Sequence, residues 1–174
     1  IRYPLAGYFH ERLAEGQLNP LKAKAMVIRQ GSRSFAVAFC DLTGIATDLT
    51  HAVRLEIMQR SDIKPEQIVL CATHSHTAPD YYRDLFLHLS EKVAVPSTDY
   101  PAHLIEQISQ CILDADRNCR PVEVKIGSAD QQAPVSFNRR FVMRDGSVKT
   151  WQKLANPQVI RAAGPIDSVL SFCS

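Results

Sequence analysis

The residues best suited to chemistry are two histidines, His74 and His76, which directly follow an apolar run at residues 67–73. Side chains alternate along an extended chain, so residues two apart face the same way. Two imidazoles on one side, at the carboxyl end of a strand in an α/β sheet, form half of a site for a borderline metal such as zinc. A structural role for both rings is the open alternative. Three neighbouring hydroxyls are expected to orient the rings: those of Thr73, Ser75 and Thr77.

The residues after the pair exclude one zinc-hydrolase pattern. Metallo-β-lactamases carry His-x-His-x-Asp-His, whereas Ala78 and Pro79 stand at the last two positions here. Amidohydrolase barrels also begin with His-x-His on a strand, but they need eight βα units, which 174 residues cannot supply.

Two carboxylates are further candidates. Asp41 ends the predicted strand at residues 34–42, and we expect it either to accept a histidine N–H or to cap the following turn. Asp80 is expected to cap a helix beginning at Tyr81 rather than to bind metal. The other histidines are expected in solvated or capping roles: His10, His51, His88 and His103.

Composition sets the broad class. With 174 residues, 45% hydrophobic and 22% charged, the chain is long enough to bury a sizeable core in one domain. A net charge of +2, without a dense Lys/Arg run, argues against a nucleic-acid partner. No apolar run approaches the roughly 20 residues of a membrane span. The five cysteines are scattered and lack Cys-x-x-Cys spacing, so we expect free buried thiols.

Apolar periodicity predicts the elements that must position the histidines. Two strands joined by the Gly31-Ser32 turn, then a helix, lead to a buried central strand that ends at the pair. Trp151 is expected to pack on a hairpin turned by Asp145-Gly146. The predicted fold is α/β, with a mixed β-sheet flanked by helices and a β-rich C-terminal part. The predicted strands are residues 24–29, 34–42, 67–73, 121–127, 141–144, 147–151 and 169–174; the helices are 48–60, 81–93 and 102–118.

The segment Ala-Thr-His-Ser-His-Thr-Ala-Pro-Asp at residues 72–80 is similar to Ala-Thr-His-Thr-His-Ser-Gly-Pro of the neutral, non-lysosomal ceramidases and their bacterial relatives. Other segments resemble the same family in the same order. They are the Pro-Gly opening at residues 3–8, the strand region at 21–42, Ser-Phe-Asn-Arg-Arg at 136–140 and Ala-Gly-Pro-Ile-Asp at 163–167.

The resemblance implies a zinc amidase acting on a small amide or N-acyl lipid, with a place in sphingolipid metabolism and an extracytoplasmic location. It implies that His74 binds the metal and that His76 contacts the substrate or reacting centre. Arg139 is implied to lie in the same pocket. Two departures are Thr77-Ala78, where the family has Ser-Gly, and Arg140, where it has Ser.

The family's other zinc ligands, a second histidine, a glutamate and a tyrosine, come later than Ser174. Because the chain opens at Ile1 without methionine and stops on a strand-like run, we expect a single ceramidase-like N-terminal domain over residues 1–174, truncated at its C-terminal end. Zn²⁺ binding by this piece is expected to be weak or absent. A non-catalytic binding or assembly domain, or another zinc amidase or esterase on the same scaffold, are the open alternatives.

Overall fold

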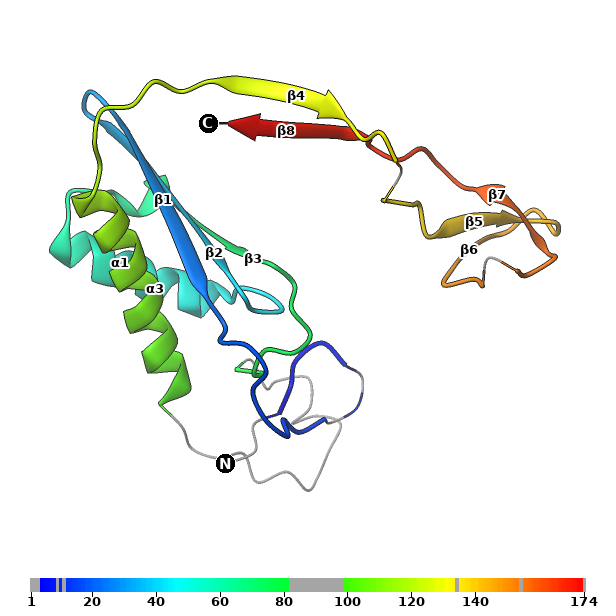
Figure 1. Cartoon of the computed structure of the whole chain (residues 1–174). Helices are drawn as coiled ribbons and strands as arrows, with labels where there is room; N and C mark the ends of the chain where they lie inside the picture. Colours follow the sequence, from blue (N-terminus) through cyan, green and yellow to red (C-terminus); the bar gives the residue numbers. More distant parts are fainter. Residues whose placement is uncertain are drawn as a thin grey trace. The chain divides into compact units, whose positions relative to one another are not determined.

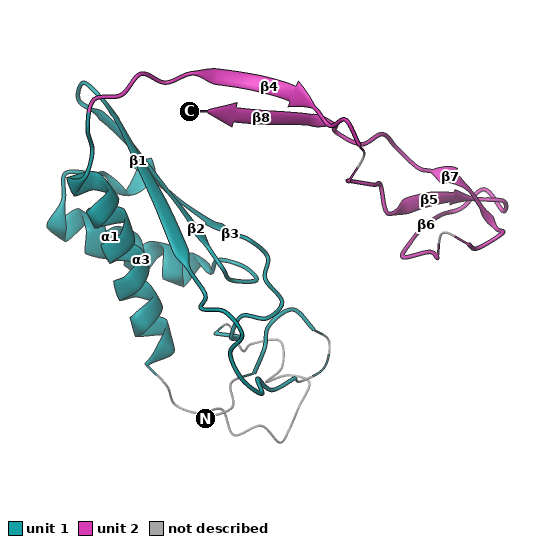
Figure 2. Ribbon diagram, in the orientation of Figure 1, with its two compact units in different colours: residues 1–120 teal, residues 121–174 magenta. Residues whose placement is uncertain are grey.

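A computed structural model describes residues 4–8, 10, 12–81, 99–133, 135–153 and 155–173. The chain forms two compact units, residues 1–120 and residues 121–174 (Figure 2). The first unit holds a mixed sheet with helices, and the described part of the second holds strands without helices. The predicted α/β class, with a β-rich C-terminal part, is confirmed.

The sheet of the first unit has the order β1-β2-β3 (Figure 1). β1 (Ala23–Gln30) is antiparallel to β2 (Arg33–Cys40) across the Gly31 turn, and β2 is parallel to β3 (Ile68–Ala72). Among the described strands β3 pairs only with β2, and Val69 is 39% exposed, so the predicted central position is wrong here. Its apolar run indicates burial on both faces, but the described helices cover only one.

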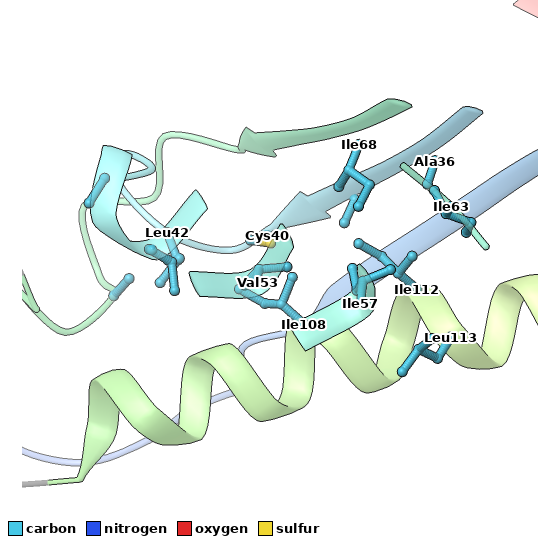
Figure 3. Packing of buried hydrophobic residues seen from close by; sticks show 14 residues of the cluster. Ala36, Cys40, Leu42, Val53, Ile57, Ile63, Ile68, Ile108, Ile112 and Leu113 are labelled. Atoms are coloured by element: carbon cyan, nitrogen blue, oxygen red, sulfur yellow. The ribbon is translucent and has the colours of Figure 1, made fainter. Parts of the chain in front are cut away.

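Two helices, α1 (Thr47–Arg60) and α3 (Tyr100–Arg117), pack on that face. The inward residues of β2 alternate as Ala36, Ala38 and Cys40, while α1 buries the predicted stripe of Leu49, Val53 and Ile57. Figure 3 shows Val53 and Ile57 in this cluster, with Ala36 and Cys40. The predicted helices at 48–60 and 102–118 are confirmed, and the short 3-10 helix η1 (Pro65–Gln67) leads into β3. The predicted helix at 81–93 lies outside the described residues, apart from Tyr81. No described helix has the length and apolar character that a bilayer crossing requires.

Arg29 links the edge strand β1 to the helical layer through hydrogen bonds. Arg29 of β1 donates two hydrogen bonds to Asp62, at 2.7 and 3.1 Å, and two to Asp116 of α3, at 2.7 and 2.8 Å. The hydrogen bonds from Arg29 lower the pKa of Asp62 below its ordinary value. The planar guanidinium suits this double bridge because its donors form a fork that matches carboxylates.

The second unit contains two small sheets. β4 (Ile126–Asp130) pairs with β8 (Val169–Cys173), and β5 (Arg140–Met143) lies between β6 (Val148–Thr150) and β7 (Val159–Ala162). The Asp145-Gly146 hairpin is confirmed, with a φ of 81° at Gly146. The predicted strand at 121–127 is largely wrong, because its alternating valines are exposed and pairing begins only at Ile126.

The described cysteines are all free, as predicted. Only Cys40 is fully buried, while Cys119 and Cys173 are exposed, so the expected burial holds for one thiol and fails for those two. Burial raises the pKa of the Cys40 thiol to about 11, with smaller contributions from Cys111, Asp41 and Cys71. Cys40 therefore behaves as a protonated core side chain at neutral pH.

Candidate functional site

His74 is held in a single ring orientation by a backbone carbonyl. β3 ends at Ala72, and His74 adopts a φ of 62°, in the left-handed region that L-residues enter at a cost of about 1–2 kcal/mol. Its Nδ1 lies 2.7 Å from the carbonyl oxygen of Thr43. A carbonyl oxygen only accepts hydrogen bonds, so Nδ1 carries the proton in this contact. The other ring nitrogen, Nε2, then keeps its lone pair.

The loop that supplies this carbonyl is itself anchored on both sides. The Thr43 hydroxyl donates to the carbonyl of Ser75, and the Ser75 N–H donates to the carbonyl of Leu42 at 3.1 Å. Beyond it, the Tyr81 hydroxyl donates to the Gly44 carbonyl and accepts from the Ala46 N–H, both at 2.9 Å. The Thr43 carbonyl is therefore fixed in position before any ligand arrives.

His76 lies beside His74, with 4.8 Å between the ring centroids and an interplanar angle of 79°. The Tyr8 ring also lies close to His76 and nearly perpendicular to it, with a centroid distance of 5.6 Å and an interplanar angle of 83°. Arg12 places its guanidinium 4.0 Å from the Tyr8 ring centroid and donates from Nη2 to the His76 carbonyl at 2.8 Å. Ring and backbone of His76 are thus both contacted by the N-terminal segment.

Pairing between distant segments brings that N-terminal segment to the histidines. Leu5 forms a β-bridge with Pro79, the Ala6 N–H donates to the Ala78 carbonyl, and the Asp80 N–H donates to the Pro4 carbonyl. At Gly7, with a φ of 87°, an added Cβ would lie 2.6 Å from His76 Nδ1. Only glycine combines this conformation with so close an approach to the ring.

The predicted orienting hydroxyls do not touch the rings. The Thr73 hydroxyl donates to Asp41 Oδ1 at 3.2 Å, and the hydroxyls of Ser75 and Thr77 are 3.1 Å apart. Asp41 also accepts from the Lys22 N–H at 3.0 Å, so it binds the strand ends and not a histidine. The prediction that the three hydroxyls orient the rings is wrong, because the Thr43 carbonyl already binds His74 Nδ1. Of the two alternatives left open for Asp41, accepting a histidine N–H is not the one observed.

The remaining polar candidates have mixed outcomes. Asp80 is buried, and the helix that it was predicted to cap lies outside the described residues. His51 and His103 are exposed, as expected. His10 is exposed as well, yet its ring lies 5.6 Å from Tyr8, on the segment that contacts His76. In the described ranges, no three His, Cys, Asp or Glu side chains are placed to hold a metal ion together.

Arg139 belongs to the second unit, so its predicted place in the pocket of the histidines stays a prediction. Its neighbours are well anchored. Asn138 accepts from the Arg140 N–H at 3.0 Å and donates to the Pro165 carbonyl at 3.4 Å, and the Ala163 N–H donates to the Arg140 carbonyl at 2.8 Å. The segments at 136–140 and 163–167, both singled out from the sequence, therefore contact one another.

A wide, open cleft of about 1450 Å³ lies next to the histidine segment. Ser75 and Thr77 line it, together with residues of the 14–22 segment and of α3. Apolar side chains contribute most of its wall area, among them Leu21, Leu104 and Ile108. No sequence pattern predicted this cleft, because its walls come from segments far apart in the chain.

Four residues of this site were not predicted as site residues from the sequence: Gly7, Tyr8, Arg12 and Thr43. Two signals were available: residues 3–8 resemble the family's opening segment, and Tyr8, His10 and Arg12 alternate, which places three side chains capable of polar or aromatic contacts two residues apart. Thr43 acts through its backbone, which every residue type carries, so no signal existed for it.

Comparison with protein-family models, with curated protein sequences and with solved structures gives no match. The ceramidase resemblance stays a prediction that depends on the segments quoted above.

Proposed function

We propose that the protein is a zinc-dependent amide hydrolase for N-acyl-lipid, ceramide-like substrates, and that this chain carries part of the site. The observation that carries the proposal is the hydrogen bond between His74 Nδ1 and the Thr43 carbonyl. Metal-binding histidines almost always donate their second ring nitrogen to a carbonyl or carboxylate, which fixes the tautomer that binds metal. His74 already has that arrangement, with Nε2 as the free ligand atom.

The residues present fit a zinc ion in part. His74 would hold the metal through Nε2, the nitrogen donor that zinc favours. When bound, zinc polarises an amide carbonyl and lowers the pKa of its water to about 7. His76, held beside His74 by Gly7, Tyr8 and Arg12, is suited to accept and return a proton. Arg139 would hold the carbonyl oxygen as it gains negative charge.

The acyl part of the substrate is assigned to the cleft beside Ser75 and Thr77. The lining of the cleft includes Ser75 and Thr77 of the histidine segment but neither histidine, and it is mainly apolar. An alkyl chain there would bury apolar surface at a gain of about 0.8 kcal/mol per methylene. Its amide end would then lie close to the histidine segment.

One observation favours a second candidate, a non-catalytic binding or assembly domain that retains the fold. The described residues bring no third metal-binding side chain to His74 and His76. Two ligands leave half of a tetrahedral zinc site to be supplied from elsewhere. The two candidates differ in one outcome, because only the hydrolase turns over an amide.

Zinc binding tests the first step of the proposal. Titration of the purified protein should show weak zinc binding, with ¹⁵N NMR reporting Nδ1 as the protonated nitrogen of His74. His74→Gly keeps the positive φ and removes the ring, so binding should disappear while the fold is retained. His103→Ala, on the exposed side of α3, is the control and should bind zinc as the native protein does.

A hydrolysis assay tests the proposed amide-cleaving activity. Ceramide and short N-acyl amides should be cleaved by the zinc-loaded protein in its full-length form and not by His74→Gly. Zinc binding that survives His74→Gly would remove the proposed metal ligand. Zinc bound through His74 without turnover of any of these amides would favour the non-catalytic domain.

A further inference from the structure

Trp151 occupies an unusual position for the chain's only tryptophan. It follows the end of β6, its side chain is 77% exposed, and its φ is 61°. The prediction that it packs on the hairpin is wrong, because most of its surface is exposed. A strained backbone is commonly retained where it aims a side chain at a functional position.

The indole has a specific partner in Arg139, whose Cζ lies 4.4 Å from the centroid of the Trp151 ring. Strand pairing explains how they meet. Arg140 pairs with Thr150 in the antiparallel β5–β6 ladder, so the residues just outside this pair are Arg139 and Trp151. The hydrogen bond from the Arg140 N–H to Asn138 fixes the backbone on the other side of Arg139.

The N–H donors of the Arg139 guanidinium remain available for a ligand. The Arg139 side chain makes no hydrogen bond or ion pair with another residue in the part of the chain that the structure describes. An arginine stacked on an aromatic face still presents its N–H groups at the edge of the plane, where they match a carbonyl or carboxylate oxygen. The Trp151 ring thus orients the Arg139 side chain, and the guanidinium N–H groups bond to no other residue that the structure describes.

We propose that Trp151 is a positioning residue that holds the Arg139 guanidinium for an acyl carbonyl or carboxylate oxygen of the substrate. The inference rests on the proposed function for the identity of the substrate, and on the Arg139–Trp151 contact for everything else. Trp151 acts through Arg139, which is the group that touches the ligand. Loss of the contact therefore weakens ligand binding, and Phe at position 151 preserves most of it because it keeps an aromatic face.

Fluorescence measures the contact directly, because Trp151 is the only tryptophan. Arg139→Ala should shift the emission of Trp151 and increase its quenching by iodide. Arg161→Ala is the matched control, since Arg161 lies on β7 of the same sheet and bonds to the Ala162 carbonyl. An emission spectrum that Arg139→Ala leaves identical to that of the native protein overturns the proposal.

Hexanoate serves as the acyl probe, with hexanol as its control. Hexanoate should change the Trp151 emission saturably in the native protein and in Arg161→Ala, but not in Arg139→Ala. By calorimetry Trp151→Ala should weaken hexanoate binding about 2- to 5-fold, and Trp151→Phe less. Absence of saturable hexanoate binding in the native protein overturns the proposal.

The double variant separates positioning from a general structural effect. Adding Trp151→Ala to Arg139→Ala should cause no further loss of hexanoate affinity, or of kcat/KM on an N-acyl amide, because Trp151 acts only through Arg139. Losses that add overturn the inference. If hexanoate binds through Arg139 and Trp151 but no amide is cleaved, the proposed hydrolase fails and the inference stands.

Discussion

Gly7→Ala tests how the N-terminal segment positions His76. The substitution adds one methyl group at a residue whose φ is 87°, and that methyl would lie 2.6, 2.7 and 2.9 Å from three atoms of the His76 ring. His76 also contacts Tyr8 and His74, and its carbonyl accepts from Arg12. The ring must therefore move against packed neighbours.

Two costs of Gly7→Ala follow from this geometry. A Cβ at positive φ costs about 1–2 kcal/mol of folding free energy. In addition, the ring must retreat by about 0.8 Å, the difference between the 2.6 Å contact and the 3.4 Å at which ordinary van der Waals contact begins. A misplacement of about 1 Å in a catalytic group lowers the rate on the order of 100-fold. We expect the larger effect on turnover and the smaller one on stability.

Two glycines serve as matched controls. Gly31→Ala carries the backbone strain alone, because Gly31 has a φ of 57° and nothing within 4 Å of its added Cβ. Gly16→Ala carries neither strain nor contact. Urea unfolding gives the stability of each variant, and NMR of the His76 imidazole reports the displacement without any assumption about activity. A Gly7→Ala protein with the stability of Gly31→Ala and unmoved His76 resonances would refute the reasoning.

Three further predictions concern the first unit. Arg29→Ala should lower the free energy of unfolding at neutral pH, measured by urea unfolding at several pH values. Because pairing with Arg29 lowers the pKa of Asp62, the difference from the native protein should be present above about pH 4. It should fade as the pH drops through the folded-state pKa of Asp62. Cys40, whose pKa is raised to about 11, should resist iodoacetamide at pH 7.5 while Cys119 and Cys173 react; mass spectrometry showing equal labelling would contradict its burial. Tyr81→Phe removes the acceptor of the Ala46 N–H at the start of α1 and should cost about 1–3 kcal/mol by urea unfolding; an unchanged midpoint would mean that water replaces the hydroxyl.

Much of the secondary structure in both units was predictable because the patterns that specify it are local. The period of Leu49, Val53 and Ile57 gave α1, and alternation around Gly31 gave β1 and β2. Asp145-Gly146 gave the β5–β6 turn, where the positive φ of Gly146 is a property of the residue type. The alternating valines of residues 121–125 led to a wrong strand prediction, because alternation indicates a strand only where a partner strand is present.

The candidate site divides in the same way. The sequence by itself determined that His74 and His76 follow a strand, since the two histidines and the apolar run before them are neighbours along the chain. Only the tertiary structure decided how the two rings are held. The Thr43 carbonyl that fixes the His74 ring is a backbone group present in every residue, and Arg12 reaches His76 across 64 positions of the chain. Contacts of this kind exist only after the segments pair, so composition and spacing leave no trace of them.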